Sequence, residues 1–248
     1  MISKNKLKEL AAYRLQKRCD EEAVFVVEGP KMAAEALASG FVVRVVCATG
    51  EWLSAHTDSL LVQECYEVSD AELERLSNFK SPNQVWLLVE RNGLKDFKAL
   101  KDPKDLILAL DKIQDPGNMG TMLRTADWYG VRHVVCSTDT VSCYNPKVVQ
   151  ASMGAVFRTR VDYVDLPQWL SGCGMPVYGA SLQGTPLSGV EMPQGNAVLL
   201  IGNESRGISP AAMAQVTHPV LIPNRGGTAE SLNAAVAAGI LMDRLWNN

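Results

Sequence analysis

Three segments of the chain share one pattern, in which an apolar run of strand length is followed by glycines and polar residues that lead into the next element. In chain order they are Leu108–Gly130, Leu199–Ser209 and Ile222–Gly239. Glycine lets the backbone take positive φ and approach a ligand closely, and a capped helix start leaves amide donors pointing outward. One such segment is compatible with an ordinary strand–loop–helix connection. Three in the same part of the chain predict one ligand site built from loops.

The second half of the chain alternates predicted strands and helices, which favours a parallel sheet. Apolar runs predict strands at Leu106–Leu110, His133–Cys136, Arg160–Tyr163, Val177–Ala180, Ala197–Ile201 and His218–Ile222. Helices are expected at Gly120–Tyr129, Pro146–Ala151, Pro167–Ser171, Pro210–Gln215 and Ser231–Trp246. Either Ser231 or Asn233 can cap the last of these helices.

The first half predicts a smaller α/β domain, with strands at Ala23–Val27, Phe41–Ala48 and Val85–Val89. Glycine and proline mark one helix from Pro30 to Ala38, and Ser69-Asp70 opens another that ends at Leu76. The charged stretch around Pro103 predicts a linker. We therefore expect domains at residues 1–95 and 106–248, joined by residues 96–105.

The charge balance does not indicate a strongly basic nucleic-acid-binding domain, because the net charge is −3. RNA binding would then depend on local patches, and the first 18 residues form one. Its cations are Lys4, Lys6, Lys8, Arg14, Lys17 and Arg18. The alternative is an amphipathic helix with a solvated basic face.

The six cysteines and three histidines show no metal-ligand spacing, which predicts reduced thiols and no metal site. The N-terminal residues lack the apolar segment of a signal peptide, and no run of 18 apolar residues indicates a membrane span. We expect a cytoplasmic protein with no membrane partner.

Two other nucleotide-binding patterns are disfavoured. Gly202 and Gly207 fit the glycine spacing of a P-loop, but Ile208-Ser209 follows in place of the required lysine. No glycine fingerprint of a dinucleotide site follows the predicted strand Leu106–Leu110.

The three segments together resemble the motifs of the SpoU (TrmH-like) family of RNA ribose 2′-O-methyltransferases, in the SPOUT class. The matching residues are Asp115-Pro116-Gly117-Asn118-Met119-Gly120 with Arg124, then Gly202-Asn203-Glu204 with Gly207, then Ile222-Pro223 with Ser231-Leu232-Asn233. The match runs from about Leu108 to the C-terminus, with the motifs in the family's order. One departure is visible, because the third motif is a residue longer than usual and has Asn224-Arg225 where the family has Met. FVVEGPKMAAEAL also resembles the family's L30e-like N-terminal substrate-binding domain.

The resemblance implies an α/β fold whose C-terminal parallel-sheet domain carries a trefoil knot, a homodimer, S-adenosylmethionine as methyl donor, and rRNA or tRNA as substrate. It implies catalytic or substrate-positioning roles for Arg124, Asn118, Glu204, Ser231 and Asn233. It implies donor binding, largely by backbone groups, at Ile201, Gly202, Ile222, Pro223 and Leu232. No metal is required.

Other interpretations stay open on the residues alone. Arg124 can form a surface ion pair with Asp127, Glu204 can cap a helix, and Ser231 and Asn233 can serve only as caps. The chain can also be a non-catalytic RNA-binding protein that keeps the knotted fold, or a methyltransferase with another acceptor position. A donor-binding titration separates the first of these from an enzyme.

Overall fold

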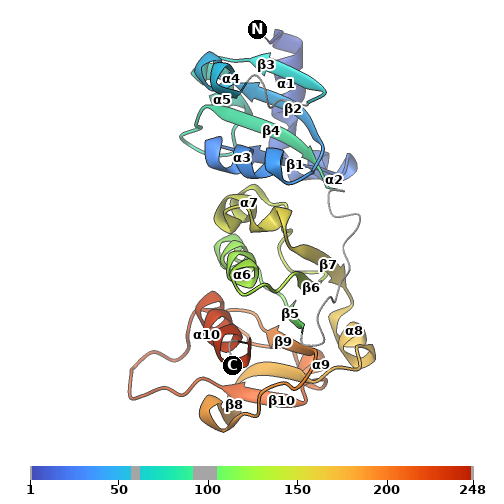
Figure 1. Ribbon diagram of the computed structural model, residues 1–248, viewed down its shortest axis with the longest axis vertical. Helices are drawn as coiled ribbons and strands as arrows, with labels where there is room; N and C mark the ends of the chain where they lie inside the picture. Colours follow the sequence, from blue (N-terminus) through green and yellow to red (C-terminus); the bar gives the residue numbers. More distant parts are fainter. Residues whose placement is uncertain (1, 57–61, 92–104, 247–248) are drawn as a thin grey trace. The chain divides into compact units, whose positions relative to one another are not determined.

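The structure, a computed structural model, describes residues 2–56, 62–91 and 105–246 and contains two compact units (Figure 1). The first unit is Met1–Asp96 together with Tyr144–Arg158, and the second is Phe97–Cys143 together with Thr159–Asn248. The chain therefore passes between the units three times. The predicted linker lies outside the described residues except for Asp105, and the sequence-based division did not include the return of residues 144–158 to the first unit.

The first unit contains a four-stranded sheet with the order β1-β4-β2-β3. β4 pairs antiparallel with β1 and β2, and β3 pairs parallel with β2. The strands are β1 Val24–Glu28, β2 Val43–Ala48, β3 Glu64–Glu67 and β4 Val85–Glu90. β3 was not predicted, because it is a short edge strand whose side chains alternate between half-buried and exposed.

Helices cover both faces of this sheet. They are α1 Lys4–Ala11, α2 Gln16–Glu21, α3 Pro30–Ala38, α4 Gly50–His56, α5 Asp70–Leu76 and α7 Pro146–Ser152, with short 3₁₀ turns at Ala12–Arg14 and Ala155–Phe157. Local signals set their starts. Pro30 occupies the first turn of α3 after Gly29 at φ +86°. At α5, Ser69 and Glu72 form a reciprocal capping box.

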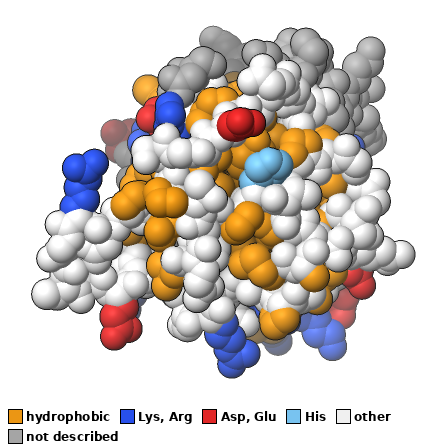
Figure 2. Space-filling model, turned by 90° about the horizontal axis from the view of Figure 1, so that it is seen from below, with side chains coloured by type: hydrophobic (Ala, Val, Ile, Leu, Met, Phe, Trp, Pro, Cys, Tyr) orange, Lys and Arg blue, Asp and Glu red, His pale blue; other side chains and the backbone are white. Residues whose placement is uncertain are grey.

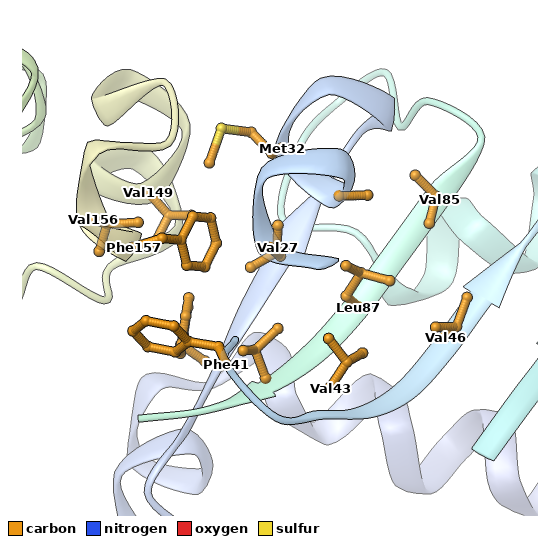
Figure 3. Packing of buried hydrophobic residues seen from close by; sticks show 14 of the residues in the cluster. Val27, Met32, Phe41, Val43, Val46, Val85, Leu87, Val149, Val156 and Phe157 are labelled. Atoms are coloured by element: carbon orange, nitrogen blue, oxygen red, sulfur yellow. The ribbon is translucent and has the colours of Figure 1, made fainter. Parts of the chain in front are cut away.

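Residues 144–158 contribute to the core of the first unit. Val149, Val156 and Phe157 join the buried cluster formed by one face of the sheet with α3 and α4 (Figure 3). The Phe157 ring lies 5.9 Å from that of Phe25 and 5.3 Å from that of Phe41, measured between centroids. α1, α2 and α5 cover the opposite face.

The second unit contains a six-stranded sheet in the order β10-β8-β9-β5-β6-β7, and every pair in it is parallel. Its strands are β5 Leu106–Leu110, β6 His133–Ser137, β7 Arg160–Val164, β8 Val177–Pro186, β9 Ala197–Ile201 and β10 His218–Leu221. Its helices are α6 Pro116–Trp128, α8 Leu166–Gly172, α9 Pro210–Met213 and α10 Ala234–Trp246, with a 3₁₀ turn at Leu187–Gly189. The predicted α/β fold with a parallel sheet is confirmed, and the knot stays a prediction.

The helices lie on both faces of this sheet (Figure 1). α8 and α9 pack on one face, around Ile107, Val198 and Leu200. On the other side α6 and α10 pack against each other, and α10 contacts β9. None of the helices within the described ranges is long and apolar enough to cross a membrane.

Three element boundaries in the second unit differ from the predictions by three residues or more. α6 begins at Pro116 rather than Gly120, because Asp115 caps it and its first turns are packed despite two glycines. α10 begins at Ala234 rather than Ser231, because Asn233 is the capping residue. β8 continues to Pro186, six residues beyond the predicted end at Ala180, where it pairs with β10.

Candidate active site

The three glycine-bearing loops lie at one edge of the second unit's sheet. They follow β5, β9 and β10, and a parallel sheet places the carboxyl ends of its strands at a common edge. β5 and β9 are direct neighbours, so the first two loops are adjacent. Open α/β sheets characteristically bind ligands outside these strand ends.

Asp111, directly after β5, joins the first loop to the second. Its buried carboxylate accepts a hydrogen bond from the Ser209 backbone nitrogen at 2.7 Å, and its own nitrogen donates to the Ile201 carbonyl at 2.9 Å. Asn203 adds another link, since its Nδ2 donates to the Lys112 carbonyl at 2.8 Å. These contacts hold the two loops in one arrangement.

Gly202, directly after β9, leaves no room for a side chain. A Cβ at this position would lie 2.1 Å from the Ile208 nitrogen and 2.2 Å from the Gly207 carbonyl carbon. Gly207 itself has φ +69° and exchanges two backbone hydrogen bonds with Asn203, at 2.9 and 3.0 Å. Gly202 is therefore required by the close approach of the loop's own backbone, and the approach of this backbone to a ligand stays a prediction.

Glu204, Asn118 and Asn233 form a hydrogen-bonded chain that contains one residue from each loop. Asn118 Nδ2 donates to Glu204 Oε1 at 2.9 Å, and Asn118 Oδ1 accepts from Asn233 Nδ2 at 2.8 Å. Asn233 Oδ1 in turn accepts from the backbone nitrogens of Ala235 and Val236, at 2.9 and 3.2 Å. Every amide in the chain thus donates on one side and accepts on the other, so its orientation is fixed.

Ser231 does not take part in this chain. Its side chain is exposed and makes no hydrogen bond to any residue that the structure describes. Of the two candidate caps, the structure selects Asn233 for α10. Ser231 is therefore open to solvent two residues before the anchored asparagine.

Arg124 is also separate from the chain. It is the ninth residue of α6, because the helix begins at Pro116, and it lies more than two turns from the N-terminus. The guanidinium is exposed and makes no hydrogen bond or ion pair with a described residue, so the alternative pairing with Asp127 is not present. The structure leaves this cation available to an external partner.

The residues expected to bind the methyl donor come from the second and third loops. Ile201 and Gly202 are buried, Ile222 is half-buried, and Pro223 and Leu232 are exposed, Leu232 to 49%. Within the described structure, the backbone N–H groups of residues 228–233 make no hydrogen bond. Free backbone donors beside exposed apolar surface and a side-chain-free turn at Gly202 fit a ligand recognised mainly through backbone groups. The described residues contain no group of three or more His, Cys, Asp or Glu able to hold a metal ion.

Comparisons with known proteins identify both parts of the chain. Residues 105–243 match the SpoU rRNA Methylase family, and residues 4–86 match the MRM3-like substrate binding domain. A 23S rRNA (guanosine(2553)-2′-O)-methyltransferase from Bacillus subtilis is 32% identical over 245 residues, covering 97% of this chain and 95% of that protein.

Solved structures give the same result. A putative RNA methyltransferase of the TrmH family from Porphyromonas gingivalis superposes with a TM-score of 0.86 at 36% identity, covering 100% of this chain and 99% of that one. An rRNA methyltransferase from Sinorhizobium meliloti, solved with AdoMet bound, gives 0.84 at 26% identity, covering 99% and 95%.

The fold and the loop site define an RNA methyltransferase of the SPOUT class. The chain belongs to the SpoU rRNA methylase family, since the family match covers more than half of it. The sequence-based identification of the family and of S-adenosylmethionine as cofactor is confirmed.

Two residues that organise the site were given no role from the sequence, although Asn203 lies within the second motif. Asp111 and Asn203 carry the contacts between the first two loops. Both are polar residues within two positions of the end of a fully buried strand. Their position just after a predicted strand, at the carboxyl edge of the sheet, was the sequence signal that could have identified them.

Proposed function

We propose that this protein transfers a methyl group from S-adenosylmethionine to the ribose 2′-hydroxyl of a nucleotide in 23S rRNA. Membership of the SpoU family supports the reaction class. The Bacillus subtilis relative and a Streptomyces viridochromogenes relative, 27% identical over 237 residues, are both named as 23S rRNA 2′-O-methyltransferases. These names support ribosomal rather than transfer RNA as the substrate.

The observation that carries the site assignment is the Glu204–Asn118–Asn233 chain, because it ties all three motif loops together at the carboxyl edge. The bound donor supplies an electrophilic methyl group. Ile201, Gly202, Ile222, Pro223 and Leu232 would hold it, chiefly through the backbone. Asn118, Glu204 and Asn233 keep the loops in the geometry that binding requires.

Arg124 acts on the ribose oxygen. A guanidinium stays charged in proteins, so it does not remove the hydroxyl proton itself. It stabilises the negative charge that develops on the oxygen as the proton departs to substrate phosphate or water. Its exposure and the absence of a partner among the described residues leave its charge available for this role. Ser231 lies on the substrate side of the third loop and contacts the RNA.

The enzyme acts as a homodimer in this proposal. Trp128 at the end of α6 is 84% exposed, and Val236 and Ile240, one turn apart on α10, are 51% and 37% exposed. Figure 2 shows the end of the second unit that carries β8 and β10, where hydrophobic side chains gather in the middle of the face and lysine and arginine lie at its margin. Exposed apolar surface of this kind favours a second copy as partner. Trp246, at the end of α10, is half-buried. The cytoplasmic location, the knot and independence from metal remain predictions.

The test compares 2′-O-methylation across total RNA from cells with and without the protein. We expect one ribose methyl in 23S rRNA to disappear. The purified protein should also show a raised Tm with S-adenosylmethionine but not with NAD or ATP, because a ligand that binds only the folded state stabilises it. An unchanged methylation map together with no thermal shift by the methyl donor would exclude the proposed activity.

A further inference from the structure

The third loop carries the pair Asn224-Arg225, where the sequence departs from its family's pattern. Asn224 binds four backbone groups of its own loop. Its Oδ1 accepts from the nitrogens of Gly226 and Gly227 at 2.9 and 2.8 Å, and its Nδ2 donates to the carbonyls of Gly227 and Ala229 at 3.0 and 3.3 Å. Gly226 takes φ +93°, which a larger residue would not adopt without strain. One side chain thus fixes residues 224–229 as a defined turn.

Arg225 extends from this turn. Its side chain is exposed and forms no ion pair or hydrogen bond with any described residue. The turn that Asn224 fixes reduces the conformational freedom of the backbone from which the guanidinium extends, so binding an anion there costs less entropy. A cation without a protein partner on an ordered turn is suited to an external anion.

The neighbouring second loop repeats the arrangement. Asn203 Oδ1 accepts from the backbone nitrogens of Ser205 and Arg206, at 3.0 and 3.1 Å. The Arg206 side chain is exposed and likewise has no partner in the described part of the chain. Two loops at the carboxyl edge therefore each hold a turn with an asparagine and present an arginine.

Chain length places Arg225 close to the candidate site. It lies four residues after Leu221, the last residue of β10, so its Cα is at most about 14 Å from the strand end. The other end of its loop is fixed by the 2.8 Å hydrogen bond between Asn233 and Asn118. Arg206 lies five residues after Ile201, the last residue of β9.

We propose that Arg206 and Arg225 bind phosphates of the RNA strand on either side of the methylated nucleotide, with Asn224 as the residue that positions Arg225. The inference rests on the proposed function, since it names how the same site holds its RNA. A guanidinium forms paired, charge-assisted hydrogen bonds with a phosphate. Two such arginines supply local positive charge for an RNA backbone in a chain whose net charge is −3. These contacts position the strand and do not read its bases.

The test uses the full-length protein and an unmodified 23S rRNA transcript made in vitro. Arg225→Ala and Arg206→Ala are compared with Arg132→Ala. Arg132 is an exposed arginine just before β6, at the amino edge of the same sheet, and its side chain has no partner among the described residues. We expect each loop variant to raise the KM for RNA about 10-fold, the typical effect of losing a charged hydrogen bond. Its kcat and its affinity for S-adenosylmethionine should stay near wild type, and Arg132→Ala should change none of these values.

Salt dependence gives a second, independent measurement by filter binding. Each lost phosphate contact should lower the slope of log affinity against log salt by about 0.7 to 0.9. Arg225→Lys should keep the slope. Asn224→Ala should raise the KM while keeping the slope, and Asn224→Asp, which keeps the acceptor for Gly226 and Gly227, should restore the KM in part.

Two results would overturn the inference. One is a KM and a salt slope for the loop variants equal to those of Arg132→Ala. The other is a fall in kcat or donor affinity in place of RNA affinity. A wild-type protein that binds the transcript but does not methylate it would instead count against the proposed substrate, and the salt slopes would still decide the role of the arginines.

Discussion

Asn118 accepts a hydrogen bond of 2.8 Å from Asn233, which lies 115 residues further along the chain, and its own amide nitrogen donates one of 2.9 Å to Glu204. Each of the three side chains comes from a different motif loop. Since one amide has both an acceptor and a donor in use, neither neighbour can lose its polar side chain without leaving a polar group of Asn118 unpaired. The three motif loops are thus coupled through Asn118.

Asn118→Asp tests this coupling. The new carboxylate would meet Glu204 Oε1 at the present 2.9 Å contact, where the amide now donates. Two facing carboxylates cannot both be charged at low cost, so the pKa of one of them rises. We expect S-adenosylmethionine affinity to fall well below wild type at pH 8 and to recover toward pH 5, where a shared proton replaces the lost N–H. Titration of S-adenosylmethionine binding at several pH values measures this change in affinity.

The matched control adds Glu204→Gln to Asn118→Asp. The glutamine amide can donate a hydrogen bond to the carboxylate at position 118. The double variant should therefore bind S-adenosylmethionine at pH 8 better than the single variant does. Parallel pH profiles for the wild type and Asn118→Asp would show that the contact does not hold the loops.

The sequence predicted the loops but not the bonds between them. Glycines after apolar runs are local signals, and they located the segments after β5, β9 and β10 in which Asn118, Gly202 and Asn233 lie. The contact of Asn118 with Glu204 joins residues 86 apart. It depends on β5 and β9 being neighbours in the sheet, and strand order is not encoded in any short window of the chain.

Packing also moved the boundaries of the helices. The pair Asp115-Pro116 is a helix-start signal, yet Gly117 and Gly120 lower helix propensity and favoured a later start. In the structure, buried Met119 and Gly120 belong to the helix, so tertiary contacts outweigh propensity. Residues 144–158 show the same limit of local sequence patterns, because no feature of this segment's own sequence indicates that it completes the core of the first unit.

Glu28→Gln should change how stability depends on pH. Burial raises the pKa of the Glu28 carboxyl, although Ser77 and Asn78 donate hydrogen bonds to it and oppose the shift. A raised folded-state pKa means that this group favours folding most below its ordinary pKa, and that the contribution is lost as pH rises through the folded value. Relative to the variant, the wild type should therefore lose stability as the pH rises above 4.5, the ordinary pKa of a glutamate carboxyl. Urea unfolding at several pH values measures the difference, and exposed Glu74→Gln should show no such trend.

Phe157→Ala should destabilise the first unit. Phe157 is 2% exposed and packs against Phe25 and Phe41. Truncating a buried phenylalanine typically costs about 3–5 kcal/mol. Leu15→Ala, at a position in the same unit that is 69% exposed, should cost less than about 0.5 kcal/mol. A urea midpoint for Phe157→Ala equal to that of Leu15→Ala would show that the segment does not support this core.

The basic N-terminal segment separates into free and paired cations. Lys6 pairs with Glu9 and Glu64, at 3.1 and 2.9 Å, and the pKa of Lys6 is raised mainly by its hydrogen bond with Glu64. Arg18 pairs with Glu22. By contrast, Lys4, Lys8 and Lys17 are exposed without a partner in the described structure.

Changing Lys4, Lys8 and Lys17 together to glutamine should weaken RNA binding and lower its salt slope by about 2 to 3. Lys6→Gln should leave the slope unchanged, because neighbouring carboxylates already compensate that charge. Donor affinity should not change in either variant. Equal slopes for the triple variant and the wild type would assign this segment to a solvated helix face.

Arg124→Ala should fold, bind S-adenosylmethionine and lose nearly all methyl transfer. The side chain contributes no hydrogen bond or ion pair to the described structure, so its removal leaves the loops and their hydrogen-bonded chain intact. Its charge matters most when the ribose oxygen becomes anionic, so the loss falls on the transition state more than on the ground state. Removing one such stabiliser costs about 10²–10³ in rate. Arg124→Lys should recover only part of it, since lysine lacks the planar fork. Single-turnover methylation at saturating donor and RNA measures the effect; a rate within a few-fold of wild type would assign Arg124 to RNA positioning and leave charge stabilisation to another group.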